Sequence, residues 1–262
     1  MKIDFKLVEF ISKEVKEIYE KSKGIKDINI GKKEGNDIVT AIDVYMESEI
    51  IKVIKNIFPE HSIYSEECGE IKQNSEYEWF IDPIDGTINF ACGIPLFSTS
   101  IALKKNDDMI LGIVLDYNTN EVYYAIKGMG AYCNGKAIKV SNNTLLKDSV
   151  ISFCLTSHYS QEHINDVLYA EKNLASKVRG LRLIVTAAIE LCWVASGKSD
   201  GMFNVKPSVG LSSAAGKLLV TEAGGKISNV YGDDRAQIDT LVVSNGKIHE
   251  ELIKELGFCN KQ

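Results

Sequence analysis

The expected order of helices and strands changes near Ser141, and this change constrains the fold more than any single motif. Before it, apolar residues recur at the spacing of one helix face over residues 5–19 and 42–57, which predicts two amphipathic helices. Short strand-like runs follow, separated by turn triplets such as Asn106-Asp107-Asp108, as in antiparallel hairpins. After Ser141, strands and helices alternate, which is typical of an α/β layer.

The two parts are expected to pack as one continuous structural unit. Residues 1–145 should form the helices and a mostly antiparallel sheet, and residues 146–262 the α/β layer, with no Pro/Ser/Gly-rich linker or repeat between them. The expected strands are at 62–65, 79–81, 97–103, 109–117, 121–126, 150–153, 178–181, 201–205, 226–228 and 240–243. The expected later helices are at 162–176, 186–196, 213–223 and 247–256.

Composition and charge argue against several classes of function. The 262 residues are 45% hydrophobic, which is enough for a full core, and their net charge of −6 argues against a nucleic-acid partner. Because no run of about 18 apolar residues occurs, no membrane helix is expected. The charged residues 1–6 do not resemble a signal peptide, and the six cysteines form no C-x-x-C pair. Reduced thiols in a cytoplasmic protein are therefore predicted.

The segment Asp82-Pro83-Ile84-Asp85-Gly86-Thr87 carries the clearest chemistry, and it follows the apolar run Trp79-Phe80-Ile81. A strand ending here would place Asp82 at its C-terminal edge, and Asp85 can converge on the same side of the proline-stiffened turn. Gly86 permits close backbone approach, and with Thr87 it can open a short helix facing a phosphate. Such carboxylates suit Mg²⁺. The alternative is an ordinary turn with a helix cap.

Two other acidic segments gain meaning only beside this motif. Glu66 and Glu67 follow the strand expected at 62–65, and as an isolated pair they would be solvated surface charge. Asp37 precedes a short apolar run, and Asp43 lies at the start of the second helix. There Asp43 could simply cap the helix or offset its dipole.

Several segments together resemble the inositol monophosphatase family, a Mg²⁺-dependent, lithium-sensitive phosphatase superfamily that includes fructose-1,6-bisphosphatases. They are Lys32 with residues 37–43, then 65–67, 79–90 and 220–225, so the resemblance covers nearly the whole chain. It implies an α+β fold, a layered αβαβα sandwich, commonly assembled as a homodimer. It also implies hydrolysis of a small phosphorylated metabolite by metal-activated water, with two or three Mg²⁺ ions as cofactors.

The resemblance implies metal ligands as well. One Mg²⁺ would be held by Glu66, Asp82 and the backbone carbonyl of Ile84, and Asp82 and Asp85 would face a second. Paired ions about 3.5–4 Å apart can both neutralise a phosphate and activate water.

The remaining matched residues surround these ligands. Gly86 and Thr87 would hold the phosphate, while Asp43 and Thr87 would orient the attacking water. The positions implied to support catalysis, the substrate or the neighbouring loop are Glu67, Lys32, Asp37, Thr186 and Ala187.

One stretch departs from the family pattern. The motif W-D-x-A-A-G corresponds to Leu211-Ser212-Ser213-Ala214-Ala215-Gly216, so Ser212 replaces the aspartate that completes the second metal site. Because a neutral hydroxyl is a weak Mg²⁺ ligand, the second site should be weakened. Asp200 could compensate or could be a turn residue. Among the positions implied to face the substrate, Val205 stands where family members often have a glutamate, and Val185 stands where they have a glycine.

Two hypotheses follow. The first is a Mg²⁺-dependent phosphatase acting on an inositol monophosphate-like compound, a sugar phosphate or a related metabolite. Its activity can be reduced but is not lost. The second is a catalytically impaired relative that binds such a metabolite without turning it over, because the usual aspartate is Ser212.

Overall fold

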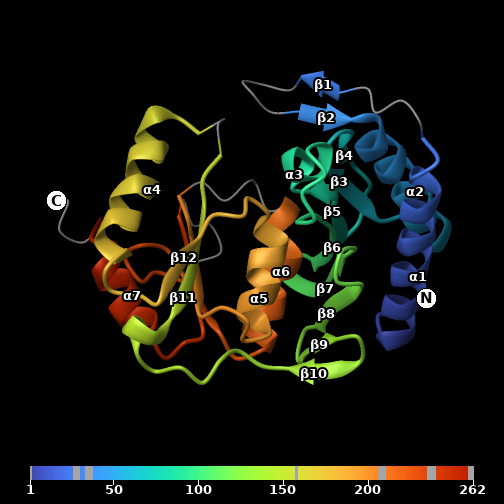
Figure 1. Cartoon of the computed structure of the whole chain (residues 1–262). Coiled ribbons are helices and arrows are strands. Elements are labelled where there is room, and N and C mark those ends of the chain that lie inside the picture. Colours follow the sequence, from blue (N-terminus) through green and yellow to red (C-terminus); the bar gives the residue numbers. More distant parts are fainter. Residues whose placement is uncertain are drawn as a thin grey trace.

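The computed structural model describes residues 2–25, 30–32, 38–156, 159–205, 211–234 and 240–258, without the side chains of Ile30 and Lys32. Its helices and sheets form five layers in the order helix, sheet, helix, sheet, helix (Figure 1). The expected α+β sandwich is therefore confirmed. Within the described chain, no helix is long and apolar enough to cross a membrane.

The first layer consists of α1 (Phe5–Ser22) and α2 (Ala41–Ile57), which pack on the outer face of the larger sheet (Figure 1). Both were predicted from their apolar spacing. Each begins at a capping side chain: Asp4 accepts hydrogen bonds from two first-turn amides of α1, and Thr40 forms a capping box with Asp43 in α2.

The larger sheet has eight strands in the order β10-β9-β8-β7-β6-β5-β3-β4. It is antiparallel as expected, except that β3 runs parallel to β5. This parallel pairing places Ser65, the last residue of β3, beside Ile81 of β5, so the chain leaves β3 next to Asp82. The strands are β3 (Ser62–Ser65), β4 (Gly69–Ile71), β5 (Tyr77–Asp85), β6 (Ser98–Lys105), β7 (Asp108–Asp116), β8 (Glu121–Ile126), β9 (Ala131–Cys133) and β10 (Lys136–Ile138).

The central layer contains α5 (Ala187–Ala195) and α6 (Leu211–Glu222), which lie between the two sheets (Figure 1). A Cβ on Gly216 would lie 2.5 Å from the Leu191 side chain. A Cβ on Gly112 of β7 would lie 2.8 Å from the backbone of Ala215. These two glycines let α6 approach both α5 and the larger sheet closely.

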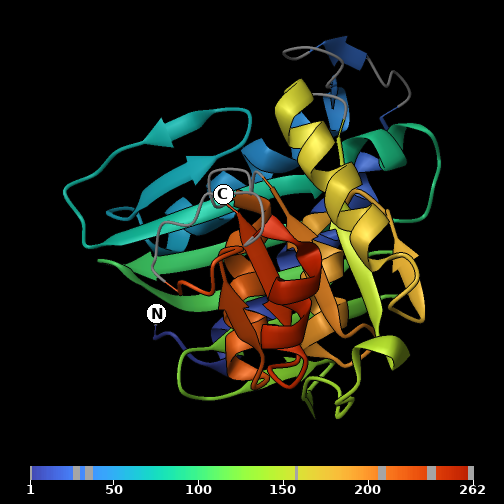
Figure 2. The ribbon, with the colours of Figure 1, turned by 90° about the vertical axis from the view of Figure 1, so that its left-hand side faces the viewer.

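The smaller sheet has the order β12-β11-β13-β15-β14, and its outer face is covered by α4 (Gln161–Leu174) and α7 (His249–Leu256) (Figure 2). The strands β12, β11 and β13 are parallel, and β15 and β14 complete the sheet in antiparallel pairs. Its strands are β11 (Val150–Cys154), β12 (Gly180–Arg182), β13 (Gly201–Asn204), β14 (Lys226–Ser228) and β15 (Leu241–Ser244).

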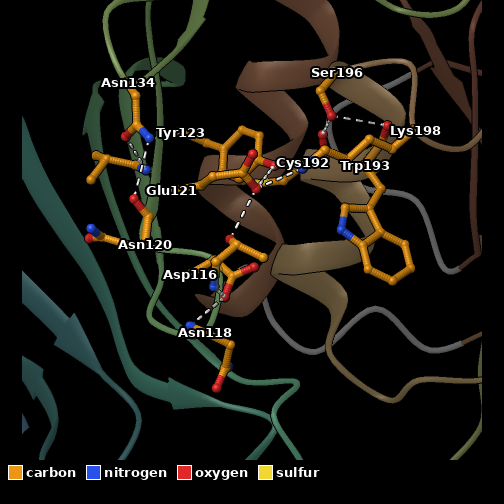
Figure 3. A network of polar contacts seen from close by, with 12 residues as sticks. Asp116, Asn118, Asn120, Glu121, Tyr123, Asn134, Cys192, Trp193, Ser196 and Lys198 are labelled. Carbon is orange, nitrogen blue, oxygen red and sulfur yellow. Dashed lines mark hydrogen bonds and ion pairs between the residues drawn. The ribbon is translucent and has the colours of Figure 1, made fainter.

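A polar network fixes the C-terminal end of α5 to the larger sheet (Figure 3). Lys198, just beyond α5, donates to Glu121 Oε2 at 2.6 Å and to the Tyr123 hydroxyl at 2.7 Å, both on β8. The Tyr123 hydroxyl also donates to Glu121 at 2.7 Å. These hydrogen bonds hold the C-terminal end of α5 against β8.

Some short elements were not predicted. They are the hairpin of β1 (Ile30–Lys32) with β2 (Ile38–Thr40), the edge strand β4 and the 3₁₀ turn η1 (Leu146–Asp148). One expectation is corrected: β5 does not end at Ile81 but continues to Asp85, because the chain re-pairs with β6 beyond a bulge. The short helix expected after Gly86 is present as α3 (Thr87–Ala91).

Candidate active site

The bulge in β5 determines where its two aspartates point. Asp82 pairs with Ser100 of β6 and Asp85 with Ser98, so three steps along β5 correspond to two along β6. On a regular strand, residues three apart point to opposite faces. The extra residue removes this alternation and lets both carboxylates reach one site. The carboxyl groups influence each other accordingly, because the charge of Asp85 raises the pKa of Asp82.

Asp82 is buried and feels the charges of the other acidic residues. Burial raises its pKa well above the ordinary value, and the charges of Glu66, Asp85 and Asp43 raise it further. Its Oδ1 atom has no hydrogen-bond partner within the described chain. The turn behind it is fixed by the Thr99 hydroxyl, which donates to the Pro83 carbonyl at 2.7 Å.

Asp85 lies against the first turn of α5. Its Oδ2 accepts hydrogen bonds from the Thr186 hydroxyl and from the Ala188 amide, the latter at 2.8 Å. Burial raises the pKa of Asp85 to about 6, although these two donors lower it. The predicted site residues Thr186 and Ala187 therefore lie at the site: Thr186 contacts Asp85 directly, and the Ala187 amide also favours its charged form.

The residues after Asp85 form a tight turn into α3. Gly86 has φ +92°, and a Cβ there would lie 2.8 Å from the Leu96 carbonyl oxygen. Only glycine avoids both the unfavourable backbone conformation and this contact. The Thr87 hydroxyl lies 2.9 Å from the Ile84 carbonyl and 3.2 Å from Asp43 Oδ1, so it bridges β5 and α2.

Asp43 is both a helix cap and a member of the acidic group. It is fully buried, and its Oδ2 accepts hydrogen bonds from the amide and hydroxyl of Thr40, the amide at 2.9 Å. Its Oδ1 faces Thr87. Burial raises the pKa of Asp43, the Thr40 and Thr87 hydrogen bonds lower it, and the Glu66 charge raises it. The capping interpretation is therefore confirmed, and the role of Asp43 in the site stays a prediction.

Glu47 is a site-supporting residue that sequence reasoning missed. It lies one turn after Asp43 on α2, is fully buried, and accepts hydrogen bonds from the amides of Glu67 at 2.7 Å and Cys68 at 3.0 Å. The available signal was a carboxylate on the buried face of α2, four residues after Asp43 and next to Met46.

The remaining residues singled out from the sequence lie in different parts of the structure or outside its described residues. Glu67 is half-buried in the turn after β3. Asp37 and the side chain of Lys32 lie outside the described residues. Ser212 is buried in the first turn of α6, where its carbonyl accepts a hydrogen bond from the Ser100 hydroxyl at 3.3 Å. Asp200 precedes β13, and its two carboxylate oxygens accept hydrogen bonds from the Ser141 hydroxyl and the Val150 amide.

Comparison with known proteins identifies the group to which this arrangement belongs. The model of the inositol monophosphatase family matches residues 1–261. The chain belongs to this family. This confirms the predicted resemblance, and the family and the names of its members support a phosphatase role, that is, a type of hydrolase.

Individual members of the inositol monophosphatase family are similar over most of their length. An Aquifex aeolicus protein named fructose-1,6-bisphosphatase/inositol-1-monophosphatase is 36% identical, covering 88% of this chain and 86% of its own. A Pasteurella multocida protein named Nus factor SuhB is 34% identical, covering 89% and 87%. The Thermotoga maritima IMPase structure superposes with a TM-score of 0.86 at 32% identity, covering 98% and 99%.

The acidic residues of this inositol monophosphatase family member fit a hard divalent cation. The neighbouring charges of Glu66, Asp85 and Asp43 raise the pKa of Asp82, and among the described residues one of its buried oxygens has no hydrogen-bond partner. Carboxylate and carbonyl oxygens are the preferred ligands of Mg²⁺. In the part of the chain that is described, no three acid, histidine or cysteine side chains are close enough to hold an ion as they stand. Binding would therefore require the carboxylates to be drawn together.

Proposed function

We propose that this protein is a Mg²⁺-dependent phosphatase that hydrolyses a small phosphate monoester, either an inositol monophosphate-like compound, a sugar phosphate or a related metabolite. The observation that carries the proposal is the burial of Asp82 among Glu66, Asp85 and Asp43 without a compensating cationic side chain among the groups that shift its pKa. A buried, mutually repelling set of carboxylates is costly unless it binds cations. The names of the related proteins, which include inositol-1-monophosphatase and fructose-1,6-bisphosphatase, support this substrate class.

Glu66, Asp82 and the Ile84 carbonyl would hold one ion, and Asp82 and Asp85 a second. Bound Mg²⁺ would neutralise the phosphate and lower the pKa of a coordinated water. The Gly86 and Thr87 backbone would hold the phosphate. Ser212 offers only a hydroxyl at the second site, so that ion should bind more weakly, and activity should depend on a high Mg²⁺ concentration.

Thr87 and Asp43 would orient the attacking water. The Thr87 hydroxyl has one proton and two acceptors within reach, the Ile84 carbonyl and Asp43 Oδ1. If the Ile84 carbonyl were to help hold an ion, the Thr87 hydroxyl would donate to Asp43 and would accept a hydrogen bond from the water. Asp43 would then receive the hydroxyl proton of Thr87 as Thr87 takes the proton of the water. Glu67, Asp37 and Lys32 are proposed to support the site. A homodimer stays a prediction from the family resemblance, and a cytoplasmic location stays a prediction from the sequence.

Phosphate release tests the proposal. Inositol 1-phosphate, fructose 1,6-bisphosphate and other monoesters would be assayed over a graded range of Mg²⁺ with wild type and Asp85→Asn. We expect Mg²⁺-dependent release from wild type and a loss of about 10²-fold or more in the variant, comparable to removing a transition-state-stabilising group. Equal release from both proteins at every Mg²⁺ concentration would contradict the proposal.

Ser212 favours the second candidate, a catalytically impaired family member. Such a protein would be stabilised thermally by a phosphorylated ligand without releasing phosphate. Ser212→Asp would then generate phosphatase activity. Turnover by wild type would exclude this alternative directly.

A further inference from the structure

The turn that carries Glu66 is held by three consecutive backbone amides. The Glu66 amide donates to the Ile81 carbonyl of β5 at 3.2 Å. The next two amides, of Glu67 and Cys68, donate to the two oxygens of the Glu47 carboxylate at 2.7 and 3.0 Å. The peptide bonds on both sides of the Glu66 Cα are therefore fixed, one to the sheet and the other to α2.

The burial and the hydrogen bonds of Glu47 suit it to holding this turn. It is fully buried, and both of its oxygens are used by the same turn. Hydrogen bonds from N–H groups to a carboxylate are about twice as strong as neutral ones. The amides in turn satisfy the buried charge, which would otherwise be costly to keep away from water.

The same helix face also carries Asp43, four residues earlier. Residues at this spacing lie one above the other on a helix. One rigid element thus presents the Asp43 carboxylate directly and the Glu66 carboxylate through the turn. The distance between the two groups is consequently set by α2 and not by a flexible loop.

We propose that Glu47 is a positioning residue for metal binding: by holding the amides of Glu67 and Cys68, it fixes Glu66 beside Asp82 and Asp43. The inference rests on the proposed Mg²⁺-dependent function. Glu47 itself contacts neither ion nor substrate, and its effect is transmitted through the backbone of the turn.

The test compares Glu47→Gln with Glu49→Gln. Both changes remove one negative charge from α2, but Glu49 is partly exposed and, within the described residues, forms an ion pair with Lys52 at 2.5 Å on the helix surface. An amide at position 47 can accept through one atom only, so one of the two turn hydrogen bonds is lost. We expect Glu47→Gln to raise the Mg²⁺ concentration for half-maximal phosphate release by about 10–100-fold. At saturating Mg²⁺, kcat should recover to near the wild-type value, and Glu49→Gln should match wild type.

Two further measurements separate positioning from a general structural role. Mn²⁺ calorimetry should show weaker binding for Glu47→Gln, with partial recovery in Glu47→Asp, which keeps the charge. Hydrogen exchange should be faster in the 62–71 segment of Glu47→Gln and unchanged in the core strand β7. An unaltered Mn²⁺ affinity in a folded Glu47→Gln protein would overturn the inference.

Other outcomes are also decisive. If Glu47→Gln does not fold, fast exchange of the Glu67 and Cys68 amides in wild type would by itself refute the proposed hold. If wild type neither binds Mn²⁺ nor releases phosphate, the proposed function fails. In that case the exchange experiment still decides whether Glu47 fixes the turn.

Discussion

Replacing Gly86 by alanine should destabilise the protein through two separable effects. The first is backbone strain, because φ is +92° and a residue with a Cβ pays about 1–2 kcal/mol in this region. The second is steric, because the new Cβ would lie 2.8 Å from the Leu96 carbonyl oxygen and 3.4 Å from Thr186 Cβ. Overpacking of this kind adds about 1–3 kcal/mol. The expected total loss in the free energy of unfolding is about 2–5 kcal/mol.

Gly224→Ala provides the matched control. Gly224 has φ +88°, and nothing lies within 4 Å of its added Cβ, so only the strain applies. Denaturant unfolding of both variants isolates the steric part as the difference between them, about 1–3 kcal/mol. In thermal unfolding this corresponds to about 2–12 °C. Equal losses in the two variants would refute the reasoning, because the close approach of residues 86 and 96 would then have no energetic consequence.

Two further stability changes follow from the region around α5. Val185 is a half-buried β-branched residue at φ +55°, so Val185→Gly relieves about 1–2 kcal/mol of strain, which offsets the added chain entropy and the lost packing. Its loss in the free energy of unfolding should therefore be about 1–2 kcal/mol smaller than that of Val140→Gly, at a valine that is also half-buried but has no positive φ, and equal losses would contradict the strain argument. Burial and the Asp85 charge raise the pKa of Glu190, so the folded state binds the proton more tightly, and wild-type stability should fall as pH rises above the ordinary value of 4.5. Glu190→Gln removes this pH dependence, so in metal-free denaturant unfolding the variant should exceed wild type in the free energy of unfolding by little at pH 4.5. Above pH 4.5 the difference should grow by up to about 1.4 kcal/mol per pH unit. A difference that stays constant with pH would show that Glu190 does not titrate in this way.

Local patterns sufficed to predict most elements of the fold. Apolar spacing located α1 and α2 because each buries one continuous face, and turn residues separated the strands of the larger sheet. The parallel pairing of β3 with β5 could not be predicted, because it joins segments through tertiary contacts that leave no local pattern. The bulge between Asp82 and Asp85 was missed for a related reason: it depends on re-pairing with Ser98.

The candidate site shows the same division. Asp82, Asp85 and Thr87 were found because they are adjacent in sequence and chemically conspicuous. Glu47 was missed because its partners are the backbone amides of Glu67 and Cys68, which any residue type would supply. A side chain that binds backbone groups leaves no complementary signal elsewhere in the sequence.

The central claim is that the buried carboxylates exist to bind Mg²⁺, and thermal unfolding of wild type and Asp82→Asn with and without Mg²⁺ tests it most directly. Without the ion, Asp82→Asn should be at least as stable as wild type, because the change removes a buried carboxyl crowded by Glu66 and Asp85. With Mg²⁺ at about 100 times its Kd, wild type should gain about 2.7 kcal/mol, and the variant should gain far less. An equal response of the two proteins to Mg²⁺, or none in wild type, would contradict the account.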